Sequence, residues 1–152
     1  MEKILEINGE VIQPLSLSLD DVRHRYPSYT VQTSFLNGVR RLITTFAGAR
    51  LWDVIGSAQL NVDPISTLCV MARARDGLHC VIRWHEVDPT LTNRIILVAY
   101  EQDKQRLTPV DGPLRLVVPG DVRGRRYLRG LVQLTVFAQT EEDESLSLDY
   151  LV

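Results

Sequence analysis

Hydrophobic and polar residues alternate along much of the chain, a pattern with a period of two that predicts strands rather than helices. We expect strands at residues 3–7, 10–12, 29–33, 41–46, 67–72, 78–84, 95–100, 114–118 and 127–138, the last as one long strand or a bent pair. Two short turns join neighbouring strands. Asn8-Gly9 predicts a hairpin between residues 3–7 and 10–12, and Asp76-Gly77 predicts a second hairpin, because both dipeptides suit left-handed turn positions.

Two short helices are expected near the N-terminus. Ser18 is a candidate N-cap, with Asp20 and Asp21 at the positive end of a helix that stops before Pro27. Residues 51–55 have the spacing of an amphipathic turn or two, which Gly56 ends or shortens. Together these elements predict one mixed α+β domain with a mainly antiparallel sheet over residues 1–140, followed by an acidic tail at 141–152.

The charge of the chain is uneven. The 152 residues have a formal net charge of −2, yet five acidic residues and no basic one lie between Glu141 and Asp149. Elsewhere 14 acidic residues face 17 basic ones, and this near-neutral body with one basic segment favours a small anionic ligand over nucleic acid. The longest apolar run, residues 95–100, is too short to cross a bilayer.

The two cysteines exclude a disulfide scaffold. Because the chain also starts without the basic and apolar sectors of a signal peptide, we expect a cytoplasmic protein. Cys69 and Cys80 are expected to be buried and inert, to remain unpaired with each other, and they lack the spacing of a zinc site. No nucleophile elbow, P-loop or dinucleotide fingerprint is present, so the sequence assigns no catalytic residue and no metal ligand.

The most informative segment runs from Pro113 to Arg129. A buried strand enters a Pro-Gly turn, and an arginine-rich loop follows. Backbone amides at glycine turns and planar guanidinium groups both bind phosphate or carboxylate. Arg126 and Arg129 are three residues apart, so only a tight loop or a helical turn would bring them together. A solvated basic loop, or salt bridges from this loop to the acidic tail, would explain the same residues equally well.

This segment resembles the cofactor-phosphate segment of the sulfite oxidase family, the molybdopterin-binding oxidoreductases. The resemblance rests on Pro-Leu-Arg-Leu-Val-Val-Pro-Gly at 113–120, followed by Gly-x-Arg-x-x-Arg at 124–129. The stretches Ile-Asn-Gly-Glu-Val at 7–11 and Phe-Ala-Gly-Ala-Arg-Leu-Trp-Asp-Val-Ile at 46–55 resemble the family's first hairpin and a helix start, in the same order. The resemblance covers roughly residues 3 to 138 and implies the family's α+β fold, a molybdopterin cofactor and a redox partner protein.

The resemblance also implies site residues. Arg115 matches the family arginine that contacts the pterin, and Arg126 matches the arginine just before a short Ser-Val-Lys segment. Tyr127, Leu128 and Arg129 match that Ser-Val-Lys segment, whose backbone and lysine hold the cofactor. Arg129 keeps the positive charge of the lysine and adds bidentate geometry for phosphate.

One departure from the family concerns the metal. Thr33 takes the place of the family's ligand cysteine, and a neutral hydroxyl is a poor substitute for a soft thiolate. Val110 stands where the family has a histidine or an asparagine that bonds to the cofactor. We therefore expect a molybdopterin-binding domain with Thr33 facing the cofactor, a degenerate metal site and no firmly held molybdenum. The alternative is a non-catalytic ligand-sensing or protein-interaction module, such as the accessory subunit of a redox complex.

Overall fold

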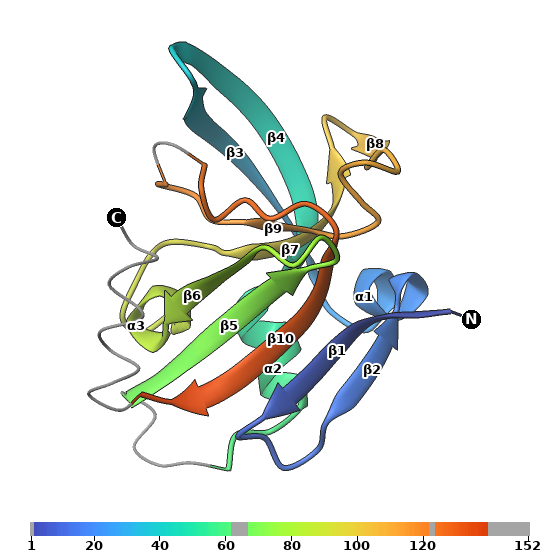
Figure 1. Ribbon diagram of the computed structural model, residues 1–152, viewed down its shortest axis with the longest axis vertical. Helices are drawn as coiled ribbons and strands as arrows, with labels where there is room; N and C mark the ends of the chain where they lie inside the picture. The colour runs from blue at the N-terminus through green and yellow to red at the C-terminus, as the bar shows by residue number, and fades with distance from the viewer. Residues whose placement is uncertain (1, 62–66, 122–123, 140–152) are drawn as a thin grey trace.

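The structure is a computed structural model that describes residues 2–61, 67–121 and 124–139 (Figure 1). Two five-stranded sheets form the domain. The first sheet has the order β2-β1-β10-β5-β6 and comprises β1 (Lys3–Gly9), β2 (Leu15–Ser18), β5 (Leu68–Ala74), β6 (His79–Arg83) and β10 (Leu131–Ala138). The second has the order β3-β4-β7-β8, with β9 also paired to β7, and comprises β3 (Ser28–Asn37), β4 (Arg40–Arg50), β7 (Leu97–Gln102), β8 (Gln105–Arg106) and β9 (Arg115–Val117).

The predicted fold class is confirmed, since the domain is mixed α+β and its described strand pairs are antiparallel except for β1 with β10. The helices are short: α1 (Leu19–His24), α2 (Leu51–Ser57) and α3 (Trp84–Val87). None of the helices in the described ranges is long and apolar enough to cross a membrane. The predicted acidic tail, residues 141–152, lies outside the described residues.

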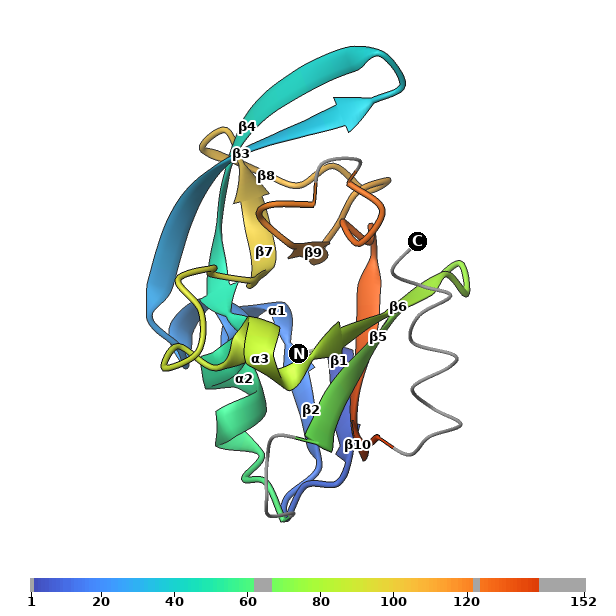
Figure 2. The ribbon, with the colours of Figure 1, turned by 90° about the vertical axis from the view of Figure 1, so that its left-hand side faces the viewer.

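The core lies between the two sheets, where β7 and β9 contribute side chains that are almost wholly buried. Phe46 on β4 and Trp84 at the start of α3 are among the largest fully buried side chains. The far half of the β3–β4 hairpin projects beyond this core, as Figure 2 shows, and overhangs the segment that follows β9. This overhang forms one side of the site described below.

The local signals at α1 and at the second hairpin are confirmed. The Ser18 hydroxyl accepts a hydrogen bond from the Asp21 amide at 3.1 Å, and the Asp21 carboxylate accepts one from the Ser18 amide at 2.9 Å, which completes a capping box. The hairpin β5–β6 turns at Asp76-Gly77, where the Asp76 carboxylate accepts a hydrogen bond from the Leu78 amide at 3.0 Å. Helix α2 continues through Gly56 and ends one residue later.

The hairpin predicted at Asn8-Gly9 is wrong. Strand β1 pairs instead with β2, and residues 10–12 form no strand beyond a single bridge from Val11 to Leu60. Gly9 does have a positive φ of 93°, but it pairs with Val136 of β10 instead of turning a hairpin. A Cβ atom at this position would lie 2.0 Å from the Val136 carbonyl oxygen, so glycine is required where the two strands run side by side.

The strand expected at 127–138 starts later than predicted. Strand β10 begins at Leu131, whereas the Tyr127 amide donates to the Gly124 carbonyl at 3.1 Å in a turn. The Leu116 amide then donates to the Leu128 carbonyl at 2.9 Å, so the chain runs beside β9 before it enters β10. This short antiparallel stretch positions the arginines of the site.

Candidate functional site

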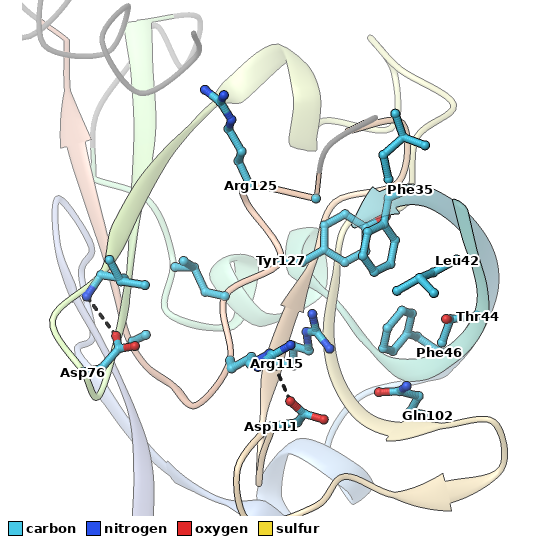
Figure 3. Close-up of a pocket in the computed structure, with 16 residues that line it drawn as sticks. Phe35, Leu42, Thr44, Phe46, Asp76, Gln102, Asp111, Arg115, Arg125 and Tyr127 are labelled. Carbon is cyan, nitrogen blue, oxygen red and sulfur yellow. Dashed lines mark hydrogen bonds and ion pairs between the residues drawn. The ribbon is translucent and has the colours of Figure 1, made fainter. Parts of the chain in front are cut away.

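A cavity of about 470 Å³ opens under the β3–β4 hairpin. Its walls come from the hairpin, from the β5–β6 turn and from the segment between Asp111 and Arg129 (Figure 3). In that view the aromatic side chains and Leu42 stand on one side, and Asp76 stands on the opposite side. Segments distant in the sequence therefore meet here, and they bring both apolar and charged groups to one hollow.

Arg115 and Arg129 lie opposite each other on this cavity. Their Cα atoms are partners in an isolated antiparallel bridge, and both side chains line the hollow. Directly opposed residues in an antiparallel pair have neighbouring side chains, so the two guanidinium groups share one region. The two charges also repel each other, and the positive charge of Arg129 is one of the causes that lower the pKa of Arg115.

Arg115 is a buried cation with an incomplete set of partners. Its residue is 7% exposed, and its Nε has no hydrogen-bond partner within the described ranges. Its guanidinium carbon lies 5.6 Å from the centre of the Phe46 ring and 6.0 Å from that of Tyr127. Burial lowers the pKa of Arg115 and the negative charge of Asp111 opposes this, but an arginine stays protonated at any physiological pH.

Arg129 is more accessible. Its side chain is 60% exposed, and its Nε lies 3.1 Å from an Asp111 carboxylate oxygen. Thr108 positions this acid, since its hydroxyl donates to the other carboxylate oxygen at 3.3 Å. Arg125 also lines the cavity, although in Figure 3 its guanidinium points away from Arg115.

Arg126 does not line this cavity. Its Nε and Nη2 donate to the Asp121 carboxylate at 2.8 and 2.9 Å, and Nη1 and Nη2 donate to the Glu86 carboxylate at 2.8 and 2.7 Å. Nη1 also donates to the Val81 carbonyl at 3.3 Å, so all five guanidinium donors are used. Burial by itself would lower the pKa of Arg126, but the hydrogen bonds to Asp121 and Glu86 raise it.

Thr33 is not on the cavity wall either. It is 4% exposed, and its hydroxyl donates to the Thr44 carbonyl at 3.2 Å. The cavity wall beside β3 is aromatic: the Phe35 and Tyr127 ring centroids are 4.6 Å apart, and those of Phe46 and Tyr127 are 6.2 Å apart. Among the resemblance-implied residues, the structure thus brings Arg115, Tyr127, Leu128 and Arg129 to the cavity and leaves Arg126 and Thr33 outside it.

Sequence reasoning missed several wall residues. Phe35 had a usable signal, because it lies two positions after Thr33 on a strand and therefore faces the same side. Phe46 lay inside a predicted strand but was taken only as part of a helix-start motif. Asp111 had no signal beyond a local Thr-x-x-Asp pattern with Thr108, and its pairing with Arg129 depends on the tertiary fold.

The side chains around the cavity suit an anion better than a metal ion. In residues 2–61, 67–121 and 124–139, no cluster of three histidines, cysteines or carboxylates has the arrangement of a metal site. Cys69 and Cys80 are buried and do not pair with each other, as expected, and neither lines the cavity. Burial raises the pKa of Cys80 to about 12, which keeps its thiol protonated.

Comparisons with known proteins agree with the fold. A family model described as "Oxidoreductase molybdopterin binding domain" matches residues 3–145. Among solved structures, the sulfane dehydrogenase SoxCD from Paracoccus pantotrophus superposes with a TM-score of 0.74 at 20% sequence identity. The superposition covers 92% of this chain and 39% of the dehydrogenase chain. A comparison with curated protein sequences found no match.

Proposed function

The chain belongs to the oxidoreductase molybdopterin-binding domain family, and from this premise we propose that its cavity binds the anionic part of a molybdopterin-type ligand. The observation that carries the proposal is Arg115, a buried and permanently charged side chain on the cavity wall with an unsatisfied donor. A buried charge without a full set of partners is destabilising, and a bound anion supplies a compensating negative charge. The volume of about 470 Å³ falls in the ordinary range for small-molecule sites, roughly 300–1,000 Å³.

Each wall residue has a distinct proposed part. Arg115 supplies a fixed charge from the floor of the cavity, and Arg129 supplies a more exposed guanidinium that turns toward the ligand. The rings of Tyr127 and Phe46 give a planar ligand an apolar surface on which to pack. Leu128 holds the arginine-bearing segment against β9 through its backbone carbonyl.

The part that the resemblance implies for Arg126 changes in this proposal. With all five donors committed to Asp121, Glu86 and Val81, Arg126 has none left for a ligand. It instead holds the loop after β9 against α3 and β6, and in this way it positions Tyr127 and Arg129. We count it as a positioning residue.

The residues present fit the anionic part of the cofactor and do not fit a metal bound through the protein. In the family, the bound cofactor supplies oxygen-atom or electron transfer. The Thr33 hydroxyl is a hard, neutral group that is already hydrogen-bonded, so it is a poor ligand for a soft metal centre. We therefore propose a degenerate metal site and derive no redox step for this chain.

The same observations support a second candidate function. A domain that binds the anion without a protein-ligated metal would serve as a ligand-sensing module or as an accessory subunit for a redox partner protein. Metal content separates both candidates from an intact oxidoreductase: protein expressed with a supply of molybdenum should contain well under one metal ion per chain by elemental analysis. Stoichiometric molybdenum would contradict the degenerate site and favour an oxidoreductase. We propose a cytoplasmic location, which the two free cysteines favour.

Anion binding is the direct test of the proposal. Isothermal titration with sulfate, and with a pterin phosphate, should give saturable binding that Arg129→Ala weakens by about tenfold or more, because a charge-assisted hydrogen bond contributes roughly 1.5–3 kcal/mol. Arg25→Ala is the matched control, since it removes an exposed arginine beyond the end of α1. Equal affinity in the Arg129→Ala variant, the control and the parent protein would remove the anion site.

A further inference from the structure

We propose that the Tyr127 side chain seals residue 33 off from the cavity, so that no ligand in the cavity can be bonded by residue 33, whichever side chain that position carries. The inference rests on the geometry of three packed rings and on the proposed function, which it extends by excluding residue 33 from the groups that contact the ligand. It also means that the loss of the family's cysteine at position 33 and the gain of a tyrosine at position 127 each prevent residue 33 from bonding a ligand in the cavity.

The two side chains lie next to each other in the interior. Thr33 and Tyr127 are each 4% exposed. The Tyr127 hydroxyl is the buried end of the ring. Thr33 lies two positions before Phe35 on β3 and points to the same face of the strand, where the Phe35 ring packs against Tyr127. Burial raises the pKa of Tyr127, and the Thr33 hydroxyl opposes this rise. Tyr127 lines the cavity and Thr33 does not, which is the arrangement expected if the ring stands between Thr33 and the hollow.

The ring is held on several sides. Phe35 packs against it with ring centroids 4.6 Å apart, and Phe46 lies at 6.2 Å. The guanidinium of Arg115 approaches the same ring at 6.0 Å. Since packed interiors have few alternative rotamers, Tyr127 cannot swing away from residue 33 without moving these neighbours.

Gly124 is part of the same arrangement. A Cβ atom at this position would lie 2.7 Å from Cδ2 of Phe35, so a side chain there would push Phe35 out of its contact with Tyr127. The positive φ of 64° independently favours glycine. The turn from Gly124 to Tyr127 therefore sets both the position of Tyr127 and the room for the ring that backs it.

The resemblance to the family pairs a small serine at position 127 with a cysteine at position 33. In this chain a large ring stands in place of the small side chain. A cysteine introduced at position 33 would therefore be covered by the ring and could reach neither a metal nor a reagent in the cavity. The substitution at 33 alone should not restore a metal ligand.

Thiol accessibility tests the inference without any cofactor. Cys69 and Cys80 are 0% and 3% exposed, so the parent protein should react very slowly with the disulfide reagent DTNB under native conditions. Thr33→Cys should stay equally slow, roughly 100-fold slower than the same thiol in denaturant, because reaction requires local opening. Thr33→Cys combined with Tyr127→Ser should add one rapidly reacting thiol per chain.

The matched control keeps the ring. Thr33→Cys combined with Tyr127→Phe should remain unreactive, since phenylalanine preserves the ring and removes only the hydroxyl. Thermal unfolding followed by circular dichroism establishes that each variant is folded before its thiols are titrated. Rapid reaction of Thr33→Cys alone would overturn the inference, so this single variant keeps it open to contradiction even if the serine variant fails to fold.

Two further outcomes are informative. A folded Thr33→Cys/Tyr127→Ser protein with no new reactive thiol would also overturn the inference, because the ring would then not be the barrier. Sulfate titration of the same variants distinguishes this failure from failure of the proposed function. Anion binding depends on Arg115 and Arg129, and it should persist in Thr33→Cys whatever the thiol result.

Discussion

Arg115 and Arg129 face each other across an isolated antiparallel bridge, one buried beside two aromatic rings and the other reaching the surface beside Asp111. Two like charges held in register are unfavourable without a counter-charge. Asp111 provides one negative charge for the pair, and the proposed anion provides another. Sulfate binding should therefore weaken when the buried cation Arg115 is removed and strengthen when its acidic neighbour Asp111 is neutralised.

Arg115→Met should leave the ligand-free domain as stable as the parent or make it more stable, by about 1 kcal/mol or more. An apolar side chain of similar length replaces a buried charge whose desolvation is not fully compensated. Urea unfolding measures the change. Sulfate should no longer raise the thermal midpoint of this variant, and a marked loss of stability without ligand would mean that Arg115 is already satisfied.

Asp111→Asn should strengthen sulfate binding, by up to about fivefold. The ion pair with the exposed Arg129 contributes roughly 0–1 kcal/mol, and its loss frees that guanidinium for the ligand. Isothermal titration at constant ionic strength gives the affinity. Glu2→Gln, an exposed change elsewhere that alters the net charge equally, serves as the control. Weaker binding in Asp111→Asn would show that the acid orients Arg129 for the anion.

Arg126→Met should lower the unfolding free energy by about 3–5 kcal/mol, because it leaves Glu86 and Asp121 without their buried partner. Arg129→Ala, which removes a pair with an exposed member, should cost about 1 kcal/mol or less. Urea unfolding of both variants provides the comparison. A small effect of Arg126→Met would contradict the positioning role.

The ion pair at Glu86 should also make the unfolding free energy depend on pH in the acid range. Burial favours a higher pKa for Glu86, but the hydrogen bond and charge of Arg126, with help from Arg83 and Arg94, lower its pKa below the ordinary value of 4.5. A carboxyl whose pKa is lower in the folded state stabilises the fold above its unfolded pKa, and this stabilisation is lost as pH falls through the folded pKa.

The measurement is the unfolding free energy between about pH 6 and pH 3, in the parent and in Glu86→Gln. The parent should lose stability more steeply below about pH 4.5 than the variant does, although the variant is less stable at neutral pH. Parallel curves would mean that Glu86 has no part in the acid response.

Local patterns predicted the parts of this fold that depend on neighbours in the chain. The capping box at Ser18 and the turn at Asp76-Gly77 each involve residues only two or three positions apart, so their chemistry is legible in the sequence. Asn8-Gly9 misled for the opposite reason. Position 9 must lack a side chain because of Val136, which no local pattern connects to it.

The same distinction between local and long-range contacts applies to the arginine-rich segment. The sequence determined that several guanidinium groups follow a buried strand and a Pro-Gly turn, and hence that an anion is a reasonable partner. Which arginines face a ligand was decided by the tertiary structure: Arg126 meets Glu86, forty positions away, while Arg115 and Arg129 are set opposite each other by backbone pairing. The sequence shows that a residue is charged but not where its side chain points. Only the packing of the folded chain decides which partner each guanidinium meets.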